Sequence, residues 1–132
     1  MIEVYIDGAS AGNPGPSGAG IFINNNGVVE RHSIPLGEMD NHEAEFRAFI
    51  LALEICADKE YKTVSFRTDS QFVSRAVEIE FVKNKKMAPL LQEALALTKQ
   101  FDLFFMKWIP SSANKTADEL SRAAIRSNKN RK

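Results

Sequence analysis

Four acidic residues stand where the chain could gather carboxylates at one place: Asp7, Glu45, Asp69 and Asp118. Asp7 and Asp69 each follow an alternating strand pattern, while the other two lie near the starts of helical patterns. In a sheet flanked by helices, strand ends and helix starts converge on one rim, where ligands bind. Carboxylates gathered there repel one another unless cations neutralise them, and an all-oxygen set suits Mg²⁺ or Mn²⁺. Two such ions would activate a water and stabilise a leaving oxygen, so these residues point to displacement at a phosphodiester.

Each of the four acids also has a purely structural explanation. The first is followed by Gly8, and Asp-Gly is a common turn pair. The second can be a first-turn acid that the helix dipole favours, and the third can cap the helix that follows it. The fourth lies within a capping-box pattern that begins at Thr116. The argument for a shared site therefore rests on all four occurring together.

The apolar periodicity predicts the elements that position these acids. Alternation predicts strands at residues 2–7, 18–23, 28–34, 63–69 and 101–109, with loops at 35–41 and 110–112. A period near 3.6 predicts helices at residues 42–59, 70–79 and 89–100, and a last helix that begins near 114–116. A strand, a helix and a strand of this length suggest a parallel crossover. Such a crossover would put Asp7 and Asp69 side by side.

The stretch between Asp7 and Gly20 is rich in glycine and proline. Glycine lets a backbone come close to a ligand, and proline stiffens the path of the chain. We expect this stretch to form a wall of the ligand groove, with a simple hairpin as the alternative.

Composition indicates a single globular domain at residues 1–127, followed by a basic, flexible tail at 128–132. The 132 residues carry 17 basic and 17 acidic side chains, which argues mildly against strong non-specific nucleic-acid binding. With the four acids set apart, however, basic residues outnumber acids. The single cysteine, Cys56, is expected in the core, as is Trp108. No stretch has the length of a membrane span or the pattern of a targeting peptide, so we expect a cytoplasmic monomer with no obligatory protein partner.

An ordered set of motifs carries a resemblance to a known family. The motifs are Asp7-Gly8 with Gly12-Asn13-Pro14-Gly15-Pro16, Asn41 four residues before Glu45, Thr68-Asp69-Ser70-Gln71, and Ala117-Asp118-Glu119-Leu120. The chain resembles ribonucleases H of type 1, in the short bacterial and archaeal form. The resemblance implies an α/β, ribonuclease H-like fold with a five-stranded mixed sheet flanked by helices. It also implies hydrolysis of the RNA strand of an RNA–DNA hybrid by a two-metal-ion mechanism, with 5′-phosphate and 3′-hydroxyl products.

The resemblance further implies a role for particular residues. The metal ligands and catalytic residues would be Asp7, Glu45, Asp69 and Asp118, with two Mg²⁺ (or Mn²⁺) ions per site. Glu45 would also contact a 2′-hydroxyl beside the cleavage site, which gives a reason to accept RNA. The contacts to the RNA–DNA hybrid would come from Gly8, Asn13, Asn41, Ser70 and Gln71.

The chain departs from the family pattern in two places. Many relatives carry a histidine in the loop before the last helix, but residues 109–114 contain none, and we interpret His32 and His42 as incidental. The tryptophan-rich basic handle of some members is also missing, with only Lys83, Lys85 and Lys86 in that region, so we predict weaker hybrid binding. These departures support a second hypothesis, a catalytically weak or inactive nucleic-acid-binding protein of the same fold. A third, an ATP-dependent kinase-like or chaperone-like protein, normally needs a second domain that 132 residues do not provide.

Overall fold

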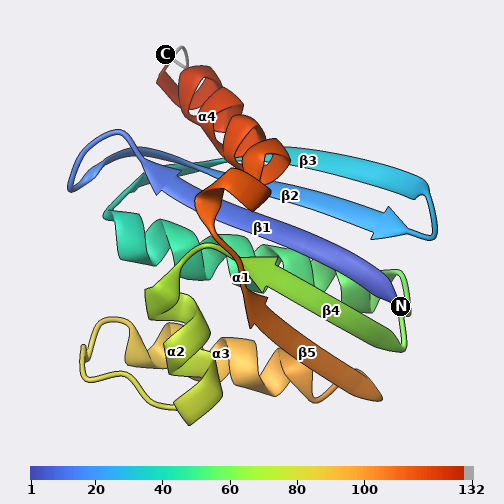
Figure 1. Ribbon diagram of the computed structural model, residues 1–132. Helices are drawn as coiled ribbons and strands as arrows, with labels where there is room; N and C mark the ends of the chain where they lie inside the picture. Colours follow the sequence, from blue (N-terminus) through green and yellow to red (C-terminus); the bar gives the residue numbers. More distant parts are fainter. Residues whose placement is uncertain (130–132) are drawn as a thin grey trace.

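A five-stranded sheet forms the centre of the computed structural model, which describes residues 1–129 (Figure 1). In spatial order the strands are β3, β2, β1, β4 and β5. Their bounds are β1 Ile2–Ser10, β2 Gly15–Asn25, β3 Val28–Met39, β4 Thr63–Thr68 and β5 Leu103–Trp108. The helices are α1 Asn41–Asp58, α2 Gln71–Ile79, α3 Ala88–Thr98 and α4 Lys115–Lys129, with a short 3₁₀ turn, η1, at Ser111–Ala113.

The sheet is mixed, as expected. β1 pairs antiparallel with β2 and parallel with β4, and β4 pairs parallel with β5. The last parallel pair between β1 and β4 joins Ile6 to Thr68. Asp7 and Asp69 follow directly on these two residues, so the predicted crossover brings the two acids to the same end of the sheet.

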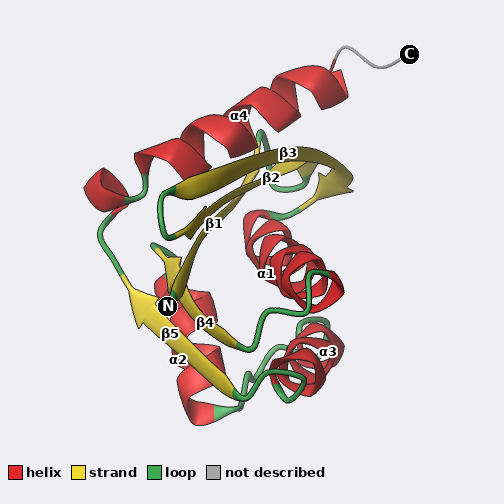
Figure 2. Cartoon of the chain, turned by 90° about the vertical axis from the view of Figure 1, so that its right-hand side faces the viewer, coloured by secondary structure: helices red, strands yellow, loops and turns green. Residues whose placement is uncertain are grey.

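The helices cover the two faces of the sheet unequally. α4 lies across one face over β1, β2 and β3, while α1 and α3 lie on the other (Figure 2). The hydrophobic core lies between the sheet and α1, α2 and α3, and its largest fully buried side chains include Phe46, Phe49 and Phe66. Cys56 is buried in this core, as predicted, and burial raises the pKa of its thiol to about 12.

Two stretches outside the predicted strands are largely strand. β1 continues past Asp7 to Ser10, and β2 begins at Gly15, so the glycine- and proline-rich stretch is a hairpin with a short turn. The predicted loop at 35–41 was also wrong, because β3 runs on to Met39 after a register shift opposite Ser17 and Gly18. Pro35 is tolerated there because β3 is an edge strand, where a missing N–H breaks no interior ladder.

Trp108 is not a core residue. Trp108 is the last residue of the edge strand β5, and it is 43% exposed. The indole N–H donates to the backbone carbonyl oxygen of Asp69 at 3.1 Å. The prediction failed because the apolar run of β5 has two faces and a free edge, and only part of it is covered by helices.

The C-terminal helix extends beyond the predicted domain end. α4 runs through Lys129, while residues 130–132 of the predicted flexible tail lie outside the described residues. No helix within residues 1–129 is long and apolar enough to cross a membrane.

Candidate active site

Asp7 is the most enclosed of the four predicted acids. It lies on the sheet face that α4 covers, and its Oδ2 accepts a hydrogen bond from Ser121 Oγ at 2.5 Å. Burial raises the pKa of Asp7 to about 7, and the hydrogen bond from Ser121 opposes that rise. The charges of Asp69, Asp118 and Glu45 raise it further, so each of the other three acids acts on Asp7.

Asp69 follows β4 and precedes the cap of α2. Ser70, not Asp69, is the N-cap, because its Oγ accepts from the Val73 N–H at 3.1 Å. The structural explanation of Asp69 as a helix cap is therefore wrong. Burial raises the pKa of Asp69, whereas hydrogen bonds with the side chains of Asn114 and Asp7 lower it. Asp7 and Asp69 directly follow the paired residues Ile6 and Thr68, so the two carboxyl groups come from adjacent strands.

Glu45 is the fifth residue of α1. Asp40 caps this helix by accepting from the Glu43 N–H at 2.8 Å, and Glu43 is the first-turn acid. Glu45 is therefore not explained by the helix dipole. Burial raises the pKa of Glu45, and hydrogen bonding from His42 and Ser70 opposes the rise. His42 Nδ1 lies 3.0 Å from Glu45 Oε1, so the interpretation of this histidine as incidental was wrong.

Asp118 lies in the first turn of α4. The helix begins at Lys115, so Thr116 is already helical and does not cap it. Asp118 Oδ2 lies 3.1 Å from Arg122 Nη2, one turn further along an exposed edge of the helix. Its charge contributes to the raised pKa values of Asp7 and Asp69, so its carboxylate faces the same rim.

The four acids have the donor chemistry for divalent cations, although the side chains are not closed around an ion position. Within residues 1–129 no three His, Cys, Asp or Glu side chains lie close enough together to hold a metal ion as they stand. Two half-buried aspartates from adjacent strands, each with a raised pKa, form a site where a bound cation would relieve the repulsion between carboxylates. Oxygen-only ligands favour Mg²⁺ or Mn²⁺, so the residues fit these ions.

Three of the predicted hybrid contacts line two hollows near the starts of α1 and α2. Asn13 and Asn41 line one hollow of about 220 Å³, together with His42 and Asn84. Gln71 lines a neighbouring hollow of about 580 Å³ together with Phe72 and other residues of α2, and the His42 ring of the first hollow packs against Phe72 of the second. Ser70, the residue before Gln71, caps α2 by accepting from the Val73 N–H.

Gly8 has a packing role that explains why it is glycine. A Cβ on this residue would lie 2.1 Å from the carbonyl oxygen of Ala44 in α1. The missing side chain therefore lets a helix, rather than a ligand, approach the strand. Its predicted contact with a hybrid stays a prediction.

Sequence reasoning missed three residues of this site. Ser121 lies one turn after Asp118 on α4, and His42 lies one turn before Glu45 on α1, so helical spacing could have found both. Asn114 gave no local signal, because its Nδ2 donates to the carbonyl oxygen of Ile6 at 2.9 Å, far away in the sequence. This contact ties the start of α4 to the strand that carries Asp7.

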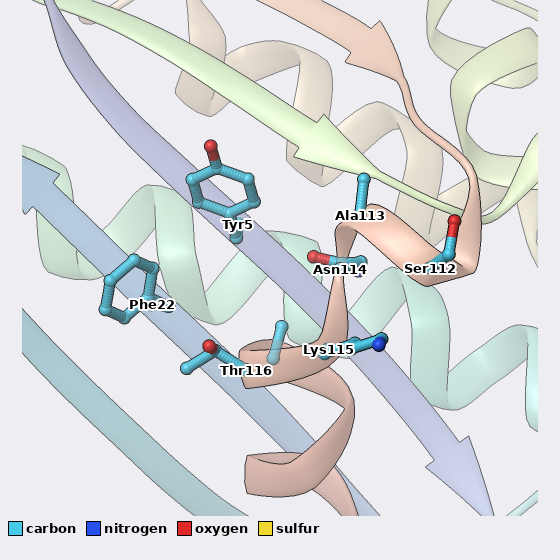
Figure 3. Close-up of a pocket in the computed structure, with 8 residues that line it drawn as sticks. Tyr5, Phe22, Ser112, Ala113, Asn114, Lys115 and Thr116 are labelled. Carbon is cyan, nitrogen blue, oxygen red and sulfur yellow. The ribbon is translucent and has the colours of Figure 1, made fainter.

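A further hollow of about 210 Å³ lies beside the site rather than in it. The rings of Tyr5 and Phe22 project from the sheet there, and residues 112–117 around the start of α4 form the opposite side (Figure 3). None of the four acids lines it. Asn114 Oδ1 is buried at its margin and has no hydrogen-bond partner among the described residues.

Comparisons with known proteins agree with this geometry. The family described as "Reverse transcriptase-like" matches residues 5–124. A protein of Enterococcus faecalis named "Putative hydrolase EbsB" is 40% identical over 127 residues, covering 95% of this chain and 94% of that protein. A protein of Desulforamulus reducens named "Ribonuclease H" is 33% identical over 141 residues, covering 95% of this chain and 87% of that protein. The chain belongs to the ribonuclease H family.

Solved structures of ribonuclease H proteins show the same fold. RNase H1 from the archaeon Halobacterium salinarum superposes with a TM-score of 0.90 at 31% identity, covering 96% of this chain and 98% of that one. The complex of LC11-RNase H1 with an RNA/DNA hybrid gives a TM-score of 0.89 at 29% identity, with the same coverage. This ribonuclease H therefore has the five-stranded mixed sheet and helix arrangement that the resemblance implied.

Proposed function

We propose that this ribonuclease H hydrolyses the RNA strand of RNA–DNA hybrids with the help of two divalent cations, leaving a 5′-phosphate and a 3′-hydroxyl. One observation carries the proposal. Asp7 and Asp69 directly follow the paired residues Ile6 and Thr68 of two adjacent parallel strands, and the charges of Glu45 and Asp118 raise the pKa of Asp7. The hybrid substrate is supported by the similar LC11-RNase H1, which was solved in complex with an RNA/DNA hybrid.

The carboxylates would hold the cations, with Asp7 between the others. When bound, such ions activate an attacking water and neutralise the charge of the leaving oxygen. Ser121 orients Asp7 from α4, and Asn114 orients Asp69 while it holds α4 on β1. Partial burial of the two aspartates strengthens their attraction to a cation relative to that of fully exposed acids.

Selection of RNA would come from side chains that flank the acids. Glu45 stands at the rim with its carboxylate oriented by hydrogen bonds, so we expect it to accept a hydrogen bond from a 2′-hydroxyl. The amides of Asn13, Asn41 and Gln71 both donate and accept, which suits hydroxyls and base edges without a strict sequence preference. Their places in two hollows joined by the contact of His42 with Phe72 fit a duplex that lies along this surface.

The test is cleavage of an end-labelled RNA–DNA hybrid with Mg²⁺ and, separately, with Mn²⁺. We expect the wild type to cut the RNA strand only, and to leave duplex DNA and duplex RNA intact. Asp69→Asn should reduce the rate by about a thousandfold, because it removes one charge from the site. Asp102→Asn is the matched control, since Asp102 is an exposed acid outside the site, and it should cleave like the wild type.

Two outcomes would contradict the proposal. The first is that the wild type does not cleave the hybrid with either metal. If the chain still bound the hybrid in that case, the second hypothesis of an inactive binding protein would hold. Equal cleavage by the wild type and Asp69→Asn would show that the acids are not the active site.

A further inference from the structure

His42 is the histidine that contacts the candidate active site. Its Nδ1 lies 3.0 Å from Glu45 Oε1, across one turn at the start of α1. An ionised carboxylate can only accept hydrogen bonds, so Nδ1 carries the hydrogen and donates it. The Glu45 side chain is 15% exposed and that of His42 57%, so the imidazole stands on the outer side of the carboxylate.

The orientation of the imidazole is set by a second helix. The His42 ring stacks on Phe72 of α2, with 4.1 Å between ring centroids and 34° between ring planes. Phe72 in turn packs edge-on against the buried Phe46, with 5.7 Å between centroids. An aromatic stack of this kind restricts the side-chain rotamers of a residue that is otherwise exposed. His42 is therefore fixed between α1 and α2.

The start of α1 is itself braced from another segment. Lys86 Nζ lies 3.4 Å from Asp40 Oδ2 and 3.3 Å from Glu43 Oε1, so the loop before α3 is tied to the capping residue and first turn of α1. The first turn that carries His42 is thus held at both its cap and its side.

We propose that His42 is a positioning residue that orients the Glu45 carboxylate for binding a divalent cation. The proposal rests on the proposed function of the four acids. A glutamate side chain has three rotatable bonds, and ordering it upon binding reduces affinity unless neighbouring groups order it beforehand. His42 supplies such a hydrogen bond to Glu45, and its own ring is held by Phe72 of α2. Outer groups that orient a ligating carboxylate affect affinity or activity by about 10- to 100-fold.

The experiment compares the wild type with His42→Ala, His42→Asn and the control His32→Ala. The amide nitrogen of asparagine stands close to the place of Nδ1, so His42→Asn keeps a donor but not the ring. His32 is the matched control, because it also hydrogen bonds a glutamate, Glu30, but lies on β3 away from the four acids. Mn²⁺ binding is measured by calorimetry on the protein without substrate, and kcat and KM are measured on a hybrid at saturating Mn²⁺.

We expect His42→Ala to weaken Mn²⁺ binding about tenfold and to lower kcat about tenfold, with KM changed less than about twofold. His42→Asn should recover most of both losses, and His32→Ala should match the wild type. Wild-type affinity and kcat in His42→Ala would overturn the proposal. So would a His42→Asn variant as impaired as His42→Ala, since the ring and not the donor would then matter, or a change in KM alone.

The measurement of Mn²⁺ binding without substrate tests this proposal separately from the proposed function. A wild type that binds Mn²⁺ but does not cleave a hybrid contradicts the proposed function, while the relative Mn²⁺ affinities still decide the role of His42. A wild type that binds no Mn²⁺ overturns both.

Discussion

At the scale of single residues, the candidate site is a set of acids placed where charge is unfavourable. Burial raises the pKa values of Asp7, Glu45 and Asp69, and mutual repulsion adds to that rise. Hydrogen bonds from Ser121 and His42 only partly compensate for it. Such an arrangement lowers the stability of the protein without cations and favours their binding, which is typical of a functional site.

The stability of the cation-free protein should therefore depend on pH through Asp7. The pKa of Asp7 is about 7 in the folded chain, whereas the ordinary value for an aspartate is 3.8, so the unfolded chain releases this proton more readily. The free energy of unfolding should then fall as pH rises from about 4 to about 7, and change little above that. Urea unfolding followed by circular dichroism at pH 5 and pH 8, with a chelator present, measures this.

Replacement of the acid should remove that dependence. Asp7→Asn should be more stable than the wild type at pH 8 by about 1–2 kcal/mol, a value discounted for partial exposure, and should be inactive. Asp102→Asn is again the control and should keep the wild-type dependence. An Asp7→Asn variant that is less stable than the wild type at pH 8 would show that the charge of Asp7 does not lower the free energy of unfolding.

At the scale of elements, glycines in the first hairpin set how closely the helices approach the sheet. A Cβ on Gly20 would lie 2.0 Å from the carbonyl oxygen of Ala117 and 2.6 Å from the Ser121 nitrogen. A Cβ on Gly18 would likewise lie 2.5 Å from the carbonyl oxygen of Ser121. These glycines allow α4 to lie on the strands, and α4 delivers Asp118 and Ser121 to the rim.

Gly20→Ala should therefore disturb both stability and activity. The new methyl group meets backbone atoms that cannot move without shifting α4, so we expect a loss of about 3 kcal/mol in the free energy of unfolding. Hybrid cleavage should fall more steeply than the folded fraction does, because Asp118 moves with the helix. Asn25→Ala, at the end of the same strand, serves as the control. Unchanged stability in Gly20→Ala would mean that α4 packs less closely than it does here.

At the scale of the whole molecule, the site is assembled from four elements spread over the chain. Asp7 comes from β1, Glu45 from α1, Asp69 from the end of β4 and Asp118 from α4. The contact between Asn114 and Ile6 joins the last helix to the first strand. A cation bound by acids from separate elements acts as a cross-link in the folded chain only, and so stabilises it.

Mg²⁺ or Mn²⁺ should accordingly raise the melting temperature at pH 8. At an ion concentration tenfold above the dissociation constant, the gain is about 1.4 kcal/mol, or about 5 °C for a domain of this size. Sodium chloride at equal ionic strength is the control for screening, and Asp69→Asn should show a much smaller shift. An equal shift in the wild type and in Asp69→Asn would place the bound ions elsewhere.

Local patterns in the sequence were sufficient for the order of the strands and helices, but not for the full lengths of β1, β2 and β3. Alternation and helical periodicity depend on neighbouring residues, and they placed Asp7 and Asp69 at the C-terminal ends of segments that pair in parallel. They did not show that Trp108 is exposed, because burial depends on which elements cover an edge strand. Nor could they show that Ser121 bonds Asp7 or that Asn114 bonds Ile6. Those contacts join residues more than 100 positions apart, and only the docking of α4 on the sheet brings them together.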